Sequence, residues 1–380
     1  MAITRLGPNQ DITAAKIAGT ISFKNLIING DMSIAQRGTS VSGLTNGSSG
    51  YKTVDRFRFE EGGSPTAVFT MSQSTDVPTG QGFGYSTKFD CTTAQGSLAS
   101  GDIIRFGTFL EGQNLQQLKK GTANAESLTL SFWVKSNKTG TYTMRLEDQD
   151  NARMICASYT ISASATWEKK TITFDGDTTG TLDNDNGLSF IVRFNLLAGT
   201  NYTSGTLQTT WGSRTDANSA VGQVNLADNT ANEWLITGIQ LEADTSASDF
   251  EFLPYDVNLR RCQRYYYYVG GTNETYKRVS TNITNPNNRN QTAGLHFLPV
   301  PMRDAPTVTI PSASNFLGVY VGGANSFSSM TISNQSEAAS EPDFNVLYVS
   351  GTMSGNVGNH CVNVEMSYFT TNKMEVSAEL

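Results

Sequence analysis

Apolar and polar residues alternate over short stretches along most of this chain. In SLTLSFWVKS, residues 127–136, every second residue from Leu128 to Val134 is large and apolar, and Trp133 falls on the opposite side of an extended strand. Similar stretches, separated by Gly, Asn and Asp clusters, are NLIING, VDRFRFEEG, TAVFTMS, GYSTKFDCT, GTYTMRLEDQ, KKTITFDGD and GLSFIVRFNLL. The pattern predicts many short strands, each with one buried face and one face that is at least partly available.

One stretch in this part of the chain predicts a helix. In EGQNLQQLKKG, residues 111–121, Leu115 and Leu118 are three positions apart, lysines close the last turn and Gly121 follows as a C-cap. A single short helix among many strands indicates an all-β chain built around a β-sandwich, not an α/β sheet.

The chain divides into three parts by composition. Residues 1–22 are polar and have no core of their own, which predicts an N-terminal anchoring arm. Residues 23–255 carry the first set of strands. The segment around Pro254 has the composition of a connector leading into a strand, and residues 256–380 form another strand-rich set, for which we expect a second, smaller β-sandwich.

Charge and cysteine usage narrow the classes of partner. The net charge is -7, which argues against a nucleic-acid groove, because phosphate binding depends on clustered Lys and Arg. The N-terminus lacks the apolar core of a secretion signal, and no run of about 20 apolar residues occurs, so we expect a soluble protein without membrane insertion. The four cysteines are widely spaced without a CxxC pair, which predicts buried thiols.

Candidate catalytic chemistry is sparse, so we predict no enzyme and no catalytic residues. The chain has two histidines, His296 and His360, and neither suggests a Ser-His-Asp or Cys-His arrangement. A polysaccharide depolymerase could use paired carboxylates, for which the available residues are Glu147, Asp148, Asp150, Asp175 and Asp177. Acidic residues are common in the turns of any β-protein, and no stacked repeats of a β-helix are visible. The depolymerase therefore stays the less favoured alternative.

Aromatic residues in irregular segments are the better candidates for ligand contacts. Trp133 and Trp234 lie in periodic strands, where packing is the favoured interpretation. Residues 199–229 are the least regular stretch of the first domain, and long loops are where binding residues concentrate. If this domain binds a glycan, Tyr202, Trp211 and Arg214 are the residues we expect to contact it.

Four consecutive tyrosines follow Arg264. On a strand Tyr265 and Tyr267 face one side, and Tyr266 and Tyr268 the other, so the run cannot form one patch. A strand that is aromatic on both faces suits a position between layers or between protomers. We therefore expect Tyr265, Tyr266, Tyr267 and Tyr268 to begin the C-terminal domain and to form an oligomer interface.

Several phrases, taken together, resemble a family of bacteriophage virion proteins, mainly tail-fibre or receptor-binding proteins of phages of aquatic bacteria. In chain order they are NLIINGDMSIAQRGTS, YKTVDRFRF, LTLSFWVKSN, NEWLITGIQLEADTSASDFEFLPYD, RRCQRYYYYVGG and FLPVPMRDAPTVTI, which together run from about Asn25 to Pro311.

The resemblance implies a jelly roll similar to a carbohydrate-binding module, followed by a β-rich domain that trimerises. Residues 29–31 would start the first jelly-roll strand beside residues 238–242, where Asp31 and Glu242 could hold a structural calcium. It further implies a virion protein, assembled in the host cytoplasm, whose arm binds other phage structural proteins and whose β-domains contact host surface polysaccharide. A capsid-decorating fibre or cement protein is the alternative.

Overall fold

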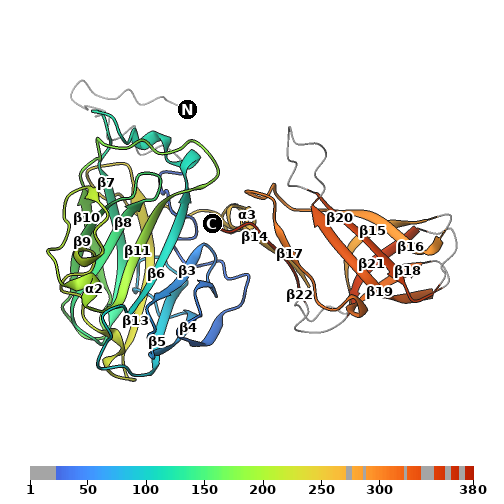
Figure 1. Cartoon of the computed structure of the whole chain (residues 1–380), viewed down its shortest axis with the longest axis horizontal. Coiled ribbons are helices and arrows are strands. Elements are labelled where there is room, and N and C mark those ends of the chain that lie inside the picture. The colour runs from blue at the N-terminus through green and yellow to red at the C-terminus, as the bar shows by residue number, and fades with distance from the viewer. Residues whose placement is uncertain are drawn as a thin grey trace, which may run out of the picture.

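The computed structural model describes residues 23–270, 276–285, 288–320, 323–334, 346–355, 361–367 and 373–380. A large β-sandwich is followed by a smaller β-barrel, with a short helix and a three-stranded sheet between them (Figure 1). The all-β class is confirmed. The expected arm, residues 1–22, lies outside the described residues.

The sandwich consists of two antiparallel sheets. The six-stranded sheet has the order β1 (Ser40–Leu44), β4 (Val68–Ser74), β5 (Ser86–Thr93), β13 (Glu233–Glu242), β7 (Leu128–Ser136) and β10 (Glu168–Phe174). The seven-stranded sheet has the order β12 (Gly212–Ser213), β9 (Arg153–Ile161), β8 (Gly140–Asp148), β11 (Leu188–Ala198), β6 (Ile103–Glu111), β3 (Phe57–Gly62) and β2 (Gly50–Tyr51). Between β11 and β13 the chain forms α2 (Thr200–Thr203), η3 (Asp216–Asn218) and η4 (Leu226–Asp228).

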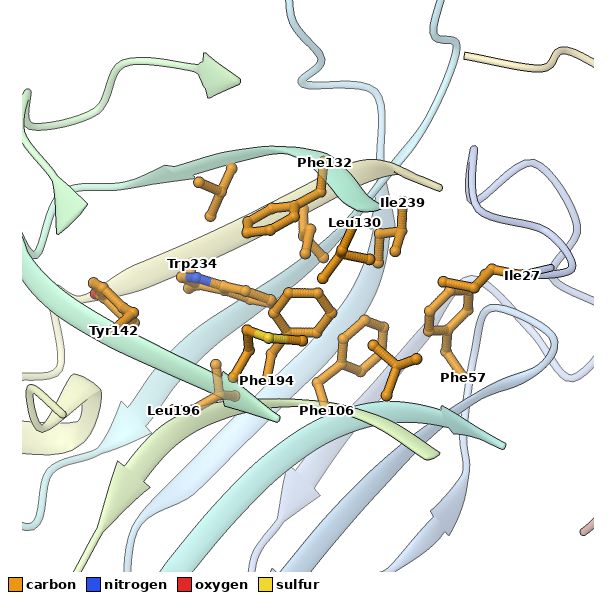
Figure 2. Packing of buried hydrophobic residues seen from close by; sticks show 14 of the residues in the cluster. Ile27, Phe57, Phe106, Leu130, Phe132, Tyr142, Phe194, Leu196, Trp234 and Ile239 are labelled. Atoms are coloured by element: carbon orange, nitrogen blue, oxygen red, sulfur yellow. The ribbon is translucent and has the colours of Figure 1, made fainter. Parts of the chain in front are cut away.

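Aromatic side chains fill the space between the two sheets. Trp234 of β13 lies close to Phe106 and Phe194 in this space (Figure 2). Its ring centroid is 6.0 Å from that of Phe89, 6.1 Å from that of Phe106 and 6.2 Å from that of Phe194. All four side chains are buried. Burying one such side chain contributes about 1.5–3 kcal/mol, so this layer is a main source of the sandwich's stability.

The helix expected over residues 111–121 is not formed. The chain makes two 3₁₀ turns instead, η1 (Gly112–Asn114) and η2 (Gln116–Leu118). Contacts with a distant loop decide this conformation, because the amide of Gln113 donates to the carbonyl of Asp185 at 2.8 Å. A side chain at Gly112 would place its Cβ 1.9 Å from the Asp183 carbonyl oxygen. Leu115 and Leu118 are buried, as their spacing suggested, but in a shape set by tertiary packing.

The expected first strand at NLIING is also absent. Residues 27–31 form a bend and a turn, and Asn29 has a left-handed φ of 62°. The segment does lie beside β13, as expected, because the amide of Ile239 donates to the carbonyl of Gly30 at 2.9 Å. A Cβ at Gly30 would sit 2.0 Å from the Ile239 carbonyl oxygen, so the close approach depends on glycine.

The segment expected to be a connector contains helix α3 (Tyr255–Gln263). It begins after Pro254, with Asp256 in its first turn and basic residues in its last, which suits the helix dipole. Cys262 and the following Tyr265 pack against Ile28 and Ile34 of the sandwich. The domain boundary expected after residue 255 therefore falls in the first turn of a helix that packs on the first domain.

A three-stranded sheet follows α3, in the order β14 (Tyr266–Gly270), β22 (Lys373–Ser377) and β17 (Thr307–Thr309). The tyrosine run does begin the first strand after the sandwich, but two of its members are buried within the chain. Tyr265 donates its hydroxyl to Glu111, and Tyr266 donates to Glu375 at 2.7 Å. Because Tyr265 and Tyr266 are covered by their own chain, they cannot form the expected oligomer interface. Tyr267 and Tyr268 are half-buried and stay candidates for it.

The second body is a closed barrel, where we expected a sandwich. Its order is β15 (Tyr276–Asn285), β16 (Asn288–Phe297), β20 (Val346–Met353), β19 (Gly323–Asn334), β18 (Phe316–Tyr320) and β21 (Cys361–Ser367), which pairs back to β15; η5 (Ala313–Asn315) precedes β18. Glycines in the strands make room where the sheet curves. A Cβ at Gly318 would lie 2.4 Å from the Met353 sulfur, and one at Gly351 would lie 2.6 Å from the Phe327 ring.

The residues that follow β22 at the end of the chain contact the sandwich. Glu379 forms an ion pair with Arg37 at 3.1 Å and a second with the buried Arg56. The Arg56 guanidinium also lies 3.4 Å from the centroid of the Tyr265 ring and donates to the carbonyl of Phe109 at 2.6 Å. In Figure 1 the C-terminus accordingly lies beside α3, next to the sandwich.

Candidate functional site

The outer face of the six-stranded sheet carries an exposed aromatic group. Phe132 of β7 points into the core, whereas Trp133 points outward and is half-buried, as the alternation predicted. Trp133 stands between Lys169 of β10 and Thr237 of β13 in the strand register. Among the described residues no acceptor bonds its indole nitrogen, so this N–H is available to a ligand.

A bulge in β13 shapes the surface next to Trp133. The register of β13 with β7 shifts between Thr237 and Gln240, and Gly238 adopts a left-handed φ of 62°. Phe83 occupies the space above this glycine. A Cβ at residue 238 would lie 2.5 Å from the Phe83 ring, so glycine is required for Phe83 to take this place.

Phe83 belongs to a cluster of three phenylalanines. Its ring centroid is 5.1 Å from that of Phe250 and 5.1 Å from that of Phe252, which are 4.9 Å from each other. Phe83 is buried, while Phe252 is 49% exposed. The cluster therefore offers an apolar surface that its own packing holds in place.

Trp133 and this cluster line a depression of about 320 Å³. Polar side chains at its border are Gln81, Ser131, Lys169 and Asp249. Concave sites with aromatic walls and a few polar groups are typical of small-ligand binding. The flat rings can stack on the apolar face of a sugar ring, and the polar groups can bond its hydroxyls. We call this site the Trp133 pocket.

The three residues predicted to contact glycan lie elsewhere, on or near the seven-stranded sheet. Trp211 packs against the core, with its centroid 6.0 Å from Phe190 and its indole N–H donating to the Asp175 carbonyl at 2.8 Å. Arg214 is paired with Glu147 at 2.6 Å. Trp211 is therefore occupied in packing, and Arg214 in an ion pair.

Tyr202 lies on α2, and its ring covers Arg105 of β6, with 5.1 Å between the guanidinium carbon and the ring centroid. It is half-buried. Tyr202 differs from Trp211 and Arg214 in its neighbour, because Arg105 has no ion pair among the described residues.

The two residues expected to hold calcium have protein partners. The Asp31 carboxylate accepts hydrogen bonds from Ser33 and Asn258, both at 3.1 Å. Glu242 accepts from the amide and the hydroxyl of Ser248. Within the described part of the chain, no group of three or more His, Cys, Asp or Glu residues is arranged to hold a metal ion. Calcium at Asp31 and Glu242 stays a prediction.

The carboxylates considered for acid–base chemistry take part in ion pairs. Glu147 pairs with Arg145 and Arg193 as well as Arg214. Burial alone would raise the pKa of Glu147, but the charges of Arg145 and Arg193 outweigh it and lower the pKa to about 2. A group with this pKa has no proton to donate at neutral pH.

Asp148 and Asp177 both form ion pairs with the buried Lys120, and Asp177 also pairs with Arg153 at 2.7 Å. These partners assign both carboxylates to holding the loops together. His296 is buried, with one ring nitrogen bonded to the Val279 carbonyl, while His360 lies outside the described residues. Three cysteines are buried as predicted, but Cys361 is exposed on β21, which corrects the expectation for that residue.

The residues that the sequence interpretation missed are Phe83, Trp133, Phe250 and Phe252. Trp133 was assigned to packing because its strand is periodic, although the same alternation points it outward. Phe250 and Phe252 alternate with acidic residues in SDFEFLP, a signal of an extended segment with one aromatic side. That these segments converge on β13 follows only from the tertiary fold.

Two other cavities are larger but lie where α3 meets the sandwich. One, of about 560 Å³, is lined by Glu111, Arg264 and Tyr265, whose polar groups already bond one another. The other, of about 380 Å³, is lined by Tyr255, Tyr267 and Tyr268. The Trp133 pocket differs from both in the cluster of three phenylalanines that lines it.

Comparisons with known proteins give structural likenesses only. No family model matches the sequence, and no curated protein matches it. The enzymatically active domain of tailspike protein 4 of bacteriophage CBA120 aligns with 58% of this chain at 13% identity and a TM-score of 0.31, and the aligned part spans 21% of that chain.

Two carbohydrate-binding proteins are aligned over nearly their whole length. A family 11 carbohydrate-binding module from Clostridium thermocellum, in complex with a β-1,3-1,4-mixed-linked tetrasaccharide, covers 55% of this chain and 98% of its own, at 11% identity and a TM-score of 0.28. TmCBM61, in complex with β-1,4-galactotriose, covers 58% of this chain and 99% of its own, at 8% identity and a TM-score of 0.29. These scores are low, so the function of this chain has to be argued from its own residues.

None of the described helices has the length and the apolar character that crossing a membrane requires.

Proposed function

We propose that this chain is a non-enzymatic structural protein of a bacteriophage particle, of the tail-fibre or receptor-binding type, and that it contacts host surface glycans. The Trp133 pocket carries the glycan part of the proposal. Trp133 is half-buried and Phe252 is 49% exposed at its border, packing within the phenylalanine cluster holds Phe252 in place, and the indole N–H is free among the described residues. Apolar groups that are kept exposed in a recess indicate a binding site.

A non-enzymatic role is supported by the state of the acidic groups. Hydrolysis of a glycosidic bond needs one carboxyl that stays protonated near neutral pH and a second that is ionised. Glu147, which is almost fully buried, has its pKa lowered by neighbouring arginines. The pocket itself contains one carboxylate among its lining residues, Asp249.

The virion part of the proposal is supported by the sequence phrases, which run from the sandwich through the tyrosine run to the end of β17. A homotrimer, anchored to other phage proteins by residues 1–22, is part of the same proposal. Tyr267 and Tyr268, which border the 380 Å³ cavity beside α3, are the residues we expect at its interface.

Mass spectrometry of purified particles tests where in the particle the protein is located. A copy number that is a small multiple of the tail symmetry supports a fibre, and hundreds of copies would support capsid decoration instead.

Glycan binding is tested with the full-length protein on an array of neutral and acidic bacterial polysaccharides. We expect Phe252→Ala to weaken binding by about tenfold, or about 1.4 kcal/mol, because it removes half-exposed stacking surface from the pocket. Trp133→Ala should have at least the same effect.

The matched control is Phe297→Ala, which removes a 69% exposed phenylalanine from the barrel. Equal binding by the Phe252→Ala and Phe297→Ala proteins would remove the pocket from the proposal. Release of reducing ends from a bound polysaccharide would overturn the non-enzymatic assignment.

A further inference from the structure

The outer face of the seven-stranded sheet is rich in arginine, in contrast to the Trp133 pocket on the opposite side of the sandwich. Arg58, Arg105, Arg193 and Arg145 point outward from β3, β6, β11 and β8, which are neighbouring strands. Arg214 belongs to the same surface. Three carboxylates lie among these arginines: Glu60 pairs with Arg193, Asp216 with Arg145, and Glu147 with both Arg193 and Arg214. Five positive and three negative charges leave a surplus of two, although the whole chain carries -7. We call this surface the arginine face.

A glycine at the centre of this face decides which arginines are neutralised. Gly107 of β6 lies between Arg58 and Arg193 in the register. Because residue 107 has no side chain, Glu60 reaches across β6 and forms a two-pronged pair with Arg193, with oxygen–nitrogen distances of 2.5 Å and 3.0 Å. A Cβ at residue 107 would lie 3.1 Å from the Arg193 side chain. Glu60 is thereby directed to Arg193 and away from its direct neighbour, Arg105.

Arg105 and Arg58 remain without an acidic partner. Among the described residues neither guanidinium has a hydrogen bond or an ion pair, and the Nε atom of each is buried. Their contacts are with aromatic rings: Arg105 lies 5.1 Å from the centroid of Tyr202, and Arg58 lies 5.2 Å from that of Phe109. A buried donor without an acceptor is costly, so a bound anion would be favoured at this place.

The electrostatic environment of Arg105 agrees with this. Burial lowers the pKa of Arg105, and the neighbouring charges of Arg145 and Arg193 lower it further, more than the charge of Glu60 raises it. Both effects oppose the positive charge in the free protein. An anion bound beside Arg105 would relieve them.

We propose that Arg105, with Tyr202 beside it, binds the carboxylate of an acidic sugar. The planar guanidinium matches the two oxygens of a carboxylate, and the half-buried Tyr202 ring offers a flat surface for the sugar ring that bears it. This site is separate from the Trp133 pocket, and it stands whether or not that pocket binds neutral sugars. It also gives Tyr202, which the sequence singled out, a chemical role.

The test is calorimetric titration of the full-length protein with trigalacturonate, with its methyl ester, and with a galactose trisaccharide that carries sulfate groups. We expect the acid to bind, the neutral ester to bind at least tenfold more weakly, and binding of the acid to weaken as salt screens the charges. A sulfated sugar that binds more tightly than the uronate would overturn the carboxylate assignment. Equal binding of the acid and its ester would overturn the site.

Two variants locate the site. Arg105→Gln should weaken binding of trigalacturonate at least tenfold, while Arg278→Gln, the same charge change at a 61% exposed side chain of the barrel, should leave it unchanged. If Arg105→Gln does not fold, Tyr202→Ala supplies the comparison, because the tyrosine is half-buried on a short surface helix. Unchanged binding in a folded Arg105→Gln or Tyr202→Ala protein would overturn the proposal. Loss of neutral-sugar binding in Trp133→Ala with uronate binding intact separates the two sites.

Discussion

The two outer faces of the sandwich cover the same aromatic core but carry opposite chemistry. The six-stranded sheet presents Trp133 and a phenylalanine cluster above the bulge at Gly238. The seven-stranded sheet presents arginines and carboxylates, several of them almost fully buried; Glu147 is 1% exposed. The first face therefore presents an exposed aromatic patch, and the second presents charges that are largely buried.

This difference shows how a β-sandwich separates stability from recognition. Alternation commits one residue in two to the core and leaves the other free. On the aromatic face the free residues make few obligatory contacts, so they can change with little effect on folding. On the arginine face many of the outward-facing residues are charges in buried ion pairs, and removing one partner of such a pair is strongly destabilising. We therefore expect changes of similar size to have very different effects on the two faces.

The largest effect should come from removing the shared anion of the arginine face. Glu147→Gln leaves Arg145, Arg193 and Arg214 without this carboxylate, and breaking a buried ion pair costs about 3–5 kcal/mol. We expect the free energy of unfolding, measured in urea, to fall by about this amount, whereas Trp133→Ala on the other face should change it far less.

Glu168→Gln is the matched control, because Glu168 of β10 pairs with Lys170 in a partly exposed position. Exposed pairs contribute roughly 0–1 kcal/mol. Equal losses in the Glu147→Gln and Glu168→Gln proteins would mean that the arginine face does not depend on its internal pairing.

A second, somewhat smaller effect concerns pH. The pKa of Glu147 is about 2 in the folded protein, below its ordinary value of 4.5, so folding favours the ionised form. Its contribution to stability is present above pH 4.5 and is lost as the pH falls towards 2, in total about 3 kcal/mol. The difference in unfolding free energy between the wild type and Glu147→Gln should shrink over this window.

Subtracting the unfolding free energy of Glu147→Gln from that of the wild type removes the contributions of other titrating groups. Burial raises the pKa of Asp55 to about 6, so its effect has the opposite sign: stability declines as the pH rises from about 4 to 6. Asp55 is present in both proteins and drops out of the difference. A difference that stays constant from pH 7 to pH 2.5 would contradict the assignment of this acid sensitivity to Glu147.

The sequence was a good guide to the strands and a poor guide to the sites, for a physical reason. Strand periodicity reports which residues meet the core, and in β7 it placed Phe132 inward and Trp133 outward correctly. It does not report conformations that distant contacts impose. The two 3₁₀ turns after β6 follow from a bond between Gln113 and Asp185, which are far apart in the sequence.

The same limit explains the candidate ligand residues. Trp211 was singled out because it lies in an irregular segment, but in the folded chain its ring packs against Phe190. The Trp133 pocket joins residues from five separate segments, and no local pattern indicates that Phe83 and Phe252 meet above Gly238. The register of the seven-stranded sheet likewise decides that Glu60 pairs with Arg193 and leaves Arg105 without a carboxylate.

The smallest stability effect of the three, but the most informative about the aromatic face, should come from Gly238→Ala. A left-handed φ of 62° costs a residue with a Cβ about 1–2 kcal/mol, and the new methyl group would lie 2.5 Å from the Phe83 ring. Phe83 has to move, so the pocket should lose glycan binding while the total loss of stability stays near 2 kcal/mol.

Gly43→Ala is the control: its φ of 74° carries the same backbone cost, but nothing lies within 4 Å of the new Cβ. Both proteins should therefore unfold more easily than the wild type, and only Gly238→Ala should lose binding on the array. If Gly238→Ala binds as Gly43→Ala does, the phenylalanine cluster does not shape the ligand site, and the aromatic face would be a packing surface like the one that holds Trp211.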